Sequence, residues 1–168
     1  VIPPTAICQN LTIQLDASGQ ASITAAQVDN GSFDNCAIDT IFLDNYNFSC
    51  SNVGSNTVTL TVVDVNGNQS TCTSTITVQD VIPPTAICQN LTIQLDASVQ
   101  ASITAGQVNN GSFDNCAIDT IFLDNYNFSC SNVGSNTVTL TVVDVNGNQS
   151  TCTSTITVQD VIPPTAIC

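Results

Sequence analysis

The chain contains no Lys, Arg, His, Glu, Met or Trp in its 168 residues, and Asp alone gives it a formal net charge of -13. Nucleic acids and anionic membrane surfaces are bound through clustered Lys and Arg side chains. The sequence therefore predicts no nucleic-acid partner and no direct membrane insertion. A Ser or Cys nucleophile also has no His or Lys to activate it. We expect no enzymatic activity, although paired Asp residues alone could still perform acid–base chemistry.

Repetition is the main feature of what remains. Residues 81–160 repeat residues 1–80 almost unchanged, and residues 161–168 begin a third copy. The three differences are Gly19 against Val99, Ala26 against Gly106 and Asp29 against Asn109. Near-identical copies are typical of tandem arrays, in which each repeat contacts its neighbours and repetition provides length or valency. We expect one domain in residues 1–80, a second in residues 81–160, and a longer array from which this segment comes.

Period-two alternation of apolar residues with Thr and Ser predicts β-strands in each repeat. The Asn66-Gly67 step between two such runs is a strong signal for a β-hairpin. Residues 25–35 are expected to form a loop with one helical turn. The expected strands lie at residues 11–15, 21–24, 39–43, 46–50, 57–62 and 75–78. The fold class predicted is all-β, with tandem immunoglobulin-like antiparallel β-sandwich domains pinned by disulfides.

Each repeat contains four cysteines, and neither repeat contains a CxxC pair or a His. This favours disulfides formed in an oxidising compartment over a zinc site, so we expect an extracellular or cell-surface location. Four cysteines allow three pairings within a repeat. The cysteines are Cys8, Cys36, Cys50 and Cys72, with counterparts Cys88, Cys116, Cys130 and Cys152.

Tandem prolines at Pro83 and Pro84 mark the joint between repeats. Proline fixes φ and lacks an N–H donor, so a strand ends before the pair and the next domain begins after it. A joint this short and proline-rich is expected to be extended and semi-rigid, which predicts a stiff rod.

Three segments carry a resemblance to a known family: the first-strand Cys after PPT, the FDNC segment, and VGSNTVTLTVVDVNGNQSTCTSTITVQD. The pattern resembles hyalin-repeat (HYR)-like domains, which are immunoglobulin-like modules of long extracellular proteins. Long arrays of them occur in cell-surface adhesins of gliding Bacteroidetes exported by the type IX secretion system, which this chain resembles. The resemblance implies a module and no catalytic residue.

The resemblance and the strand order together favour Cys8–Cys72, joining the first and last strands, and Cys36–Cys50, clamping the middle loop. The second repeat would contain Cys88–Cys152 and Cys116–Cys130. The alternative is that a cysteine crosslinks successive repeats.

Asp64, Asn66 and Asn68 have the D-x-N-x-N spacing that opens a calcium loop, and calcium takes oxygen ligands from Asp, Asn and carbonyl groups. No cation in the chain could neutralise converging carboxylates. Calcium is therefore one hypothesis, and a solvated acidic surface with a plain hairpin turn is the other. The candidate ligands are Asp34, Asp64, Asn66, Asn68 and Asp80, with Asp114, Asp144, Asn146, Asn148 and Asp160 in later positions.

Thr40 and Thr120 lie in Asp-Thr-Ile sequences, which match a bacterial O-glycosylation pattern. The alternative is that each Thr is a strand residue chosen for its β propensity.

These observations predict a non-enzymatic extracellular fibre or adhesin stalk, with lateral self-association or host and surface glycans as further expected partners. A repeated glycan- or surface-binding module is one alternative. Spacer domains of a secreted hydrolase are another.

Overall fold

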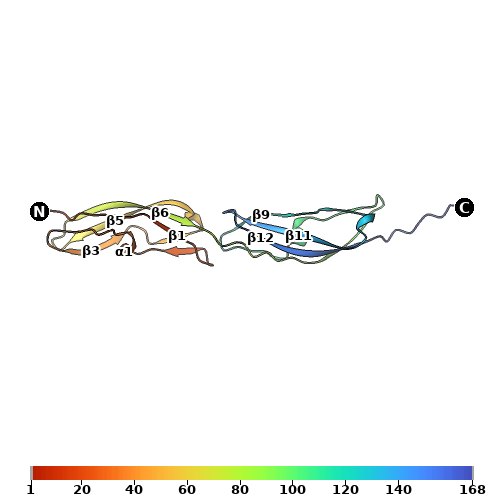
Figure 1. The fold of residues 1–168 in the computed structure, drawn as a ribbon, viewed down its shortest axis with the longest axis horizontal. Coiled ribbons are helices and arrows are strands. Elements are labelled where there is room, and N and C mark those ends of the chain that lie inside the picture. The colour runs from red at the N-terminus through yellow and green to blue at the C-terminus, as the bar shows by residue number, and fades with distance from the viewer. Residues whose placement is uncertain (1, 168) are drawn as a thin grey trace. The chain divides into compact units, whose positions relative to one another are not determined.

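The computed structural model describes residues 2–167. The chain separates into two compact units that divide between Ile82 and Pro83, two residues after the expected end of the first repeat. Figure 1 shows that strands are the main regular secondary structure of each unit.

In its described residues, 2–82, the first unit contains six strands and two short helical turns. Its single α-helical turn falls within residues 25–35, where the sequence predicts one. The elements are β1 (Leu11–Gln14), β2 (Gln20–Ser22), α1 (Ala25–Val28), β3 (Ile38–Leu43), β4 (Asn47–Ser49), the 3-10 turn η1 (Cys50–Asn52), β5 (Gly54–Asp64) and β6 (Gln69–Gln79).

The second unit repeats this order, as its near-identical sequence requires. Its elements are β7 (Leu91–Gln94), β8 (Gln100–Ser102), α2 (Ala105–Val108), β9 (Ile118–Leu123), β10 (Asn127–Ser129), the 3-10 turn η2 (Cys130–Asn132), β11 (Gly134–Asp144) and β12 (Gln149–Gln159). Residues 161–167 follow β12 without secondary structure and are exposed.

Each unit is a two-layer sandwich. A four-stranded sheet has the order β1-β6-β5-β3 in the first unit, and β2 pairs with β4 in a second, two-stranded sheet. The second unit has β7-β12-β11-β9 and β10-β8. The predicted all-β sandwich is therefore present in both copies. One pairing in each unit is parallel. β1 runs parallel to β6, with Leu11 opposite Ile76 and Gln14 opposite Gln79, and β7 runs parallel to β12 in the same way.

The core lies between the two layers. In β5, Val58, Leu60 and Val62 are fully buried, whereas the Thr residues between them are partly exposed. This is the period-two pattern expected of a strand with one face against the core. Phe48 on β4 is buried from the opposite layer. The buried apolar residues of the first unit are Leu15, Ile23, Val28, Leu43, Phe48, Val58, Leu60, Val62, Ile76 and Val78.

The predicted Asn66-Gly67 hairpin joins the two longest strands of the first unit. β5 and β6 pair antiparallel from Gly54 opposite Val78 to Val63 opposite Gln69. Gly67 has φ of +84°, a left-handed conformation that glycine adopts readily. Because this hairpin is long, it separates the two ends of the unit.

We name these ends by their residues. The leading end carries Ile2, Asn35, Cys36, Asn66 and Asn68, which line one hollow. The trailing end carries Gly54 and Gln79, together with the turn after β1. The chain enters a unit at its leading end and leaves it at its trailing end.

Candidate functional site

A disulfide joins Cys8 to Cys72 in the first unit, and Cys88 to Cys152 in the second. Both pairs agree with the pairing expected from the sequence. Each links the segment before the first strand to the last strand, across 64 positions of sequence. The Ser74 hydroxyl also donates a hydrogen bond to the Gln9 carbonyl at 2.6 Å. The first and last segments are thus held together by a covalent bond and by hydrogen bonds.

The predicted Cys36–Cys50 and Cys116–Cys130 disulfides are wrong. Cys36 and Cys130 are free and exposed, whereas Cys50 and Cys116 are both disulfide-bonded. The cause is the path of the chain between Cys36 and Cys50. That segment is not a loop, because it contains β3, which runs along β5 from the leading end towards the middle of the unit.

Cys36 and Cys50 consequently lie at opposite ends of the unit. Cys36 lines the leading-end hollow beside Asn66. Cys50 opens η1, which leads into Gly54, and its sulfur lies 3.8 Å from the Gly19 carbonyl oxygen in the turn after β1. The 11 residues of β5 separate these ends, a rise of roughly 33 Å. A disulfide requires Cα atoms about 4.4–6.8 Å apart.

Asp64 closes the hairpin at the leading end. The backbone N–H groups of Asn66 and Asn68 each donate to Asp64 Oδ1 at 2.8 Å. The Asn68 side-chain amide donates to Asp64 Oδ2 at 2.6 Å. Asp64 is only 2% exposed. These donors stabilise the charged form of Asp64 and therefore lower the pKa of its carboxyl group below the usual 3.8. The hydrogen bond from the Asn68 side chain contributes most, and burial acts in the opposite direction.

Asp144 has the same arrangement in the second unit, where Asn146 and Asn148 donate to it. The D-x-N-x-N sequence is therefore organised as a hairpin turn in which the carboxylate is the acceptor. Hydrogen-bond donors from Asn side chains and the main chain stabilise the carboxylates of Asp64 and Asp144.

Main-chain donors stabilise five other carboxylates of the first repeat in a similar way, which the sequence pattern alone did not lead us to expect. Backbone N–H groups donate to the carboxylates of Asp16, Asp29, Asp34, Asp44 and Asp80. Asp and Asn commonly accept from a backbone N–H two residues on, forming an Asx turn. The signal available in the sequence was the Asn that directly follows Asp29, Asp34 and Asp44. A chain without cations thus uses its own main chain to stabilise its carboxylates.

Two buried side-chain oxygens at the leading end of the second unit accept no hydrogen bond from the described residues. Asp114 Oδ1 and Asn146 Oδ1 have no exposed surface and no hydrogen-bond partner among the described residues. The other oxygen of Asp114 accepts from the Cys116 backbone N–H at 2.8 Å. Carboxylate and amide oxygens are the ligand types that calcium prefers. Asp114 and Asn146 therefore fit a hard cation better than Asp144 does.

The predicted metal ligands divide between the two ends of a unit. Asp34, Asp64, Asn66 and Asn68 belong to the leading end, with Asn66 and Asn68 lining the hollow there. Asp80 directly follows β6 at the trailing end, where it is 7% exposed and accepts from the Ile82 N–H at 3.2 Å. Asp160 follows β12 and accepts from the Ile162 N–H at 3.1 Å. Asp80 and Asp34 therefore do not meet within the first unit.

Thr40 lies on β3 and Thr120 on β9, and both side chains are exposed. In each strand the register shifts beside this Thr, between Ile38 and Thr40 in the first unit. Each strand is at the edge of its sheet, so the hydroxyl group can be reached from solvent.

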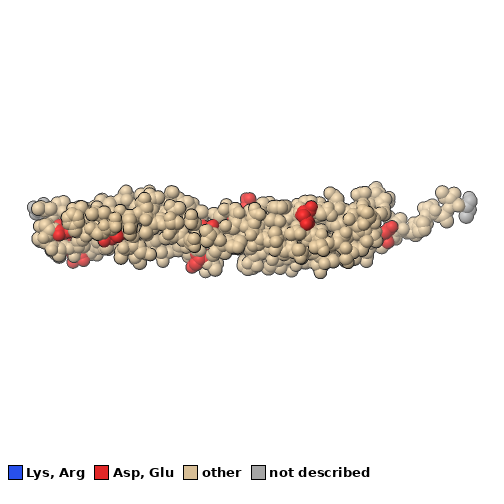
Figure 2. Space-filling view, in the orientation of Figure 1, with Lys and Arg blue, Asp and Glu red and all other residues tan. Residues whose placement is uncertain are grey.

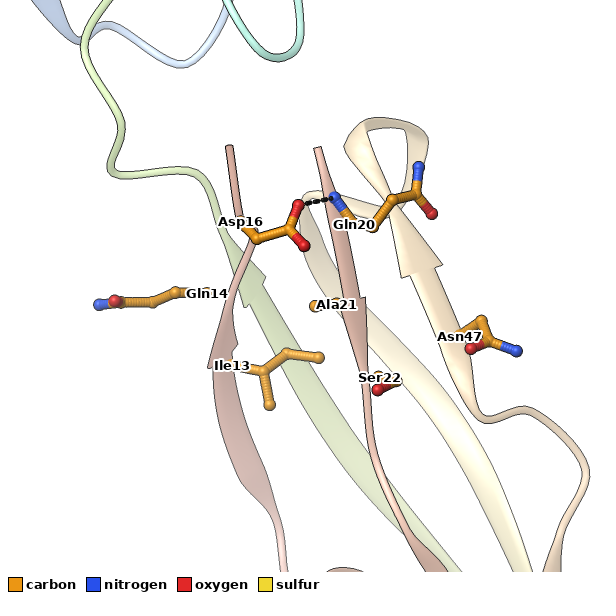
Figure 3. Close-up of a pocket in the computed structure, with 7 residues that line it drawn as sticks. All are labelled: Ile13, Gln14, Asp16, Gln20, Ala21, Ser22 and Asn47. Atoms are coloured by element: carbon orange, nitrogen blue, oxygen red, sulfur yellow. Dashed lines mark hydrogen bonds between the residues drawn. The ribbon is translucent and has the colours of Figure 1, made fainter. Parts of the chain in front are cut away.

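A hollow beside β1 and β2 recurs in both units and carries no aromatic side chain. In the first unit it is lined by Ile13, Gln14, Asp16, Gln20, Ala21, Ser22 and Asn47. Figure 3 shows Asp16 turned toward Gln20, whose backbone N–H donates to it at 3.0 Å. Asp16, the carboxylate that lines this hollow, thus accepts hydrogen bonds from the backbone N–H groups of Ser18 and Gln20 in a turn.

The surface carries acidic groups only. Figure 2 shows Asp residues as separate spots on the visible face of each unit, with no blue cationic atoms beside them. No helix within residues 2–167 has the length and apolar character needed to cross a bilayer.

Comparison with known proteins gives similarity at the level of structure alone. No protein-family model and no curated protein sequence matches the chain. Solved structures that are similar include human protocadherin-24 EC1-2 (13% identity, TM-score 0.45, covering 95% of this chain and 100% of that one). Protocadherin gamma B7 extracellular cadherin domains 1-4 is similar at 13% identity and TM-score 0.43 over 94% of this chain. The chain spans about half (51%) of the protocadherin gamma B7 structure.

Proposed function

We propose that the chain is a non-enzymatic extracellular stalk or fibre, in which each repeat is a load-bearing element of fixed length. The hyalin-repeat-like pattern of the sequence and the disulfides in both units support this proposal, since disulfides persist in oxidising, extracellular compartments. The observation that carries it is the position of Cys8–Cys72 relative to the two ends of the repeat.

Tension along the array enters a repeat near its first strand and leaves through its last. The Cys8–Cys72 bond passes that tension directly to β6, whose next residues, up to Gln79, lead out of the unit. Residues 9–71 therefore lie outside the covalent path that bears the load. A repeat built in this way cannot unravel while its disulfide is intact.

The parallel pairing of β1 with β6 would resist extension once the Cys8–Cys72 bond is reduced, because β1 then carries the load. The backbone hydrogen bonds between the two strands lie across the direction of pulling, so they must be sheared together and not opened one by one. Leu11 to Gln14 pair with Ile76 to Gln79, at the point where the load leaves the unit.

Single-molecule stretching of the oxidised and the reduced chain tests the proposal. Reduction should release the 63 residues between Cys8 and Cys72, which corresponds to roughly 220 Å of added contour length per repeat at about 3.5 Å per residue. The oxidised chain should show no step of that size. Steps of that size in the oxidised chain would exclude the load-bearing role.

A matched control is available within one molecule. Replacing Cys8 and Cys72 by Ser removes the bond from the first repeat and leaves Cys88–Cys152 in the second. Under oxidising conditions the first repeat should then unfold and extend fully under force, whereas the second repeat should not. Equal behaviour of the two repeats would mean that the disulfide does not limit extension.

A second candidate role is calcium binding at the leading end, supported by the unpartnered buried oxygens of Asp114 and Asn146. Asp80 belongs to this hypothesis as the acidic residue that directly precedes the joint. Calcium bound to the folded form alone would raise the free energy of unfolding with concentration. Thermal unfolding in calcium and in chelator, at matched ionic strength, should show a higher midpoint with calcium. Asp114→Asn should reduce that difference, and an equal midpoint in both solutions would leave the carboxylates as a solvated surface.

O-linked sugar on Thr40 and Thr120 is a further proposal for the native protein. Its support is the Asp-Thr-Ile sequence combined with an exposed hydroxyl group on an edge strand. Intact-mass measurement of native material should show added hexose-type mass, localised to residues 37–45 and 117–125. Unmodified peptides at both places would exclude it.

A further inference from the structure

Each repeat contains two Asn-Gly steps that the fold holds differently. They are Asn30-Gly31 and Asn66-Gly67 in the first repeat, and Asn110-Gly111 and Asn146-Gly147 in the second. When Gly follows Asn, the backbone nitrogen of the Gly can reach the Asn side chain, because glycine has no Cβ to obstruct the approach. All four steps are therefore candidate sites of spontaneous deamidation, and local structure decides which of them react.

Deamidation at such a step consumes only water. The Gly nitrogen attacks Cγ of the Asn side chain, so a new C–N bond forms and the bond from Cγ to the amide nitrogen breaks. The proton of the Gly N–H ends on the departing amide, which leaves as ammonia. Water then opens the cyclic succinimide at either carbonyl, giving Asp or isoaspartate. Either product has a carboxylate in place of a neutral amide, and isoaspartate also has a longer main chain.

The Asn66-Gly67 step is held in the β5–β6 hairpin turn. The Gly67 N–H donates to the Asp64 carbonyl oxygen at 3.0 Å, and the Asn66 N–H donates to Asp64 Oδ1 at 2.8 Å. The first of these bonds must break before the Gly67 nitrogen can lose its proton and attack. Both bonds also fix the backbone that flanks the Asn66 side chain. The equivalent Gly147 N–H donates to the Asp144 carbonyl oxygen at 3.2 Å.

The Asn30-Gly31 step has no such restraint. Among residues 2–167, no hydrogen bond is formed by the Gly31 N–H or by the Asn30 side chain, and both residues are exposed. A Cβ added at Gly31 would meet no atom within 4 Å, so the space around this residue is open. Asn110 and Gly111 are exposed in the same way in the second repeat. Asn66 is exposed as well, so hydrogen bonding, and not access of water, distinguishes the two kinds of step.

We propose that Asn30 and Asn110 deamidate spontaneously through a succinimide, whereas Asn66 and Asn146 are protected by their hairpins. In the folded chain the unprotected steps should react at least about fivefold faster, the factor that corresponds to about 1 kcal/mol for one hydrogen bond. Unfolding removes the difference, because the dipeptide is the same in all four places. The reaction does not depend on whether the chain bears load.

Isoaspartate at residue 30 changes the packing of the segment that precedes Cys8. The Asn30 N–H donates to the Ile7 carbonyl oxygen, and the Ser32 hydroxyl accepts from the Ile7 N–H, both at 2.9 Å. These bonds hold residues 30–33 beside residues 5–7. A longer main chain between Asn30 and Ser32 disturbs the register of the two bonds, so residues 5–7 should loosen.

Ageing of the oxidised chain at mildly alkaline pH tests this proposal. The chain is then reduced, alkylated and cleaved before Asp, which separates the sites. Residues 29–33 report Asn30 and residues 96–113 report Asn110, whereas the identical peptides 64–79 and 144–159 report Asn66 and Asn146 together. Mass spectrometry measures the conversion of amide to acid, and a peptide shortened by cleavage before a new Asp is counted as converted. A sample digested before ageing corrects for conversion during digestion.

The peptides 29–33 and 96–113 should convert at least about fivefold faster than the two hairpin peptides. In the chain unfolded by reduction and urea, the rates should become similar. Equal rates in the folded chain would overturn the proposal, and so would faster conversion in the hairpins. A folded chain that stays unconverted while the unfolded chain reacts would have the same effect.

Asn30→Ser is a matched control, since it retains the backbone N–H that bonds Ile7 and changes an exposed side chain. An isoaspartate-specific methyltransferase with its methyl donor should label the aged chain in residues 29–33 and 96–113, and the aged variant only in residues 96–113. Hydrogen exchange at Thr5 and Ile7 should accelerate on ageing in the unchanged chain and not in the variant. Label in the hairpin peptides, or exchange that accelerates equally in both chains, would contradict the proposal.

Discussion

The Asn68 side-chain amide donates to Asp64 Oδ2 at 2.6 Å, and the Asn68 backbone N–H donates to the other oxygen of the same carboxylate at 2.8 Å. Asn68 thus donates a hydrogen bond to each oxygen of a buried Asp, in a chain that has no cationic side chain. Asp64 and Asn68 are the two residues that flank the tip of the β5–β6 hairpin. The stability of this hairpin therefore depends on the charge of a single carboxyl group.

Acid should weaken the first repeat through Asp64. The pKa of Asp64 is lower in the folded protein than its usual 3.8, so the folded state binds this proton less readily than the unfolded state. The stabilisation is complete above pH 3.8 and is lost as the pH falls through the lower folded value. Urea unfolding between pH 5 and pH 2 should show this loss. Asp64→Asn should be less stable at pH 5 and should lack this part of the pH dependence, whereas Asp39→Asn, an exposed control, should retain it.

Val99→Gly should stabilise the second repeat. Val99 has φ of +63°, in the left-handed region, and its counterpart Gly19 has φ of +69°. A left-handed conformation is unfavourable for an L-residue by roughly 1–2 kcal/mol, and more so for a β-branched side chain. The expected gain in the free energy of unfolding is about 1 kcal/mol, measured by calorimetry of the two-repeat chain. Gly19→Val should destabilise the first repeat by a similar amount. No change in either variant would mean that the turn relaxes without strain.

Gly106→Ala should also stabilise the second repeat. Gly106 lies in α2, and a Cβ added there would meet only Thr104 Oγ1, at 4.0 Å. Alanine is preferred over glycine inside a helix by about 0.5–1 kcal/mol. Hydrogen exchange of the amides in residues 105–109 should slow in the variant. The reverse change, Ala26→Gly, should accelerate exchange in the first repeat. Exchange rates equal to those of the unchanged chain in both variants would contradict the prediction.

Loss of the Cys8–Cys72 bond should be the largest single effect on the first repeat. The bond closes a loop of 64 residues, for which chain entropy predicts a stabilisation of about 4 kcal/mol. The double variant Cys8→Ser with Cys72→Ser should unfold at much lower urea concentration, and the second repeat should be unaffected. A change under roughly 1 kcal/mol would indicate that the unfolded chain is already compact.

Strands, hairpin and the first-to-last-strand disulfide could be predicted because each depends on local pattern or on simple strand order. Alternating Val58, Leu60 and Val62 indicate a half-buried strand, and Asn66-Gly67 indicates a tight turn. Parallel pairing of β1 with β6 could not be predicted in this way. No turn connects those strands, and their direction is set by how the whole sandwich closes.

The Cys36–Cys50 prediction failed for a related reason. A spacing of 14 residues suggests a short loop, but a strand inside that spacing carries the two thiols to opposite ends of the unit. The calcium-like spacing at Asp64 was equally ambiguous, because an Asx turn and a calcium loop both require Asp and Asn oxygens at short intervals. Only the positions of the donor groups distinguish the two.

The Cys8–Cys72 bond has a topological consequence: it converts residues 8–72 into a covalent ring with two short tails. A single hydrolysed peptide bond anywhere from residue 9 to residue 71 opens this ring but does not sever the polymer. Most of the surface that a repeat offers to proteases and to chemical damage is therefore expendable for continuity. Hydrolysis of one peptide bond severs the chain only in the short segments between successive rings, such as residues 73–87.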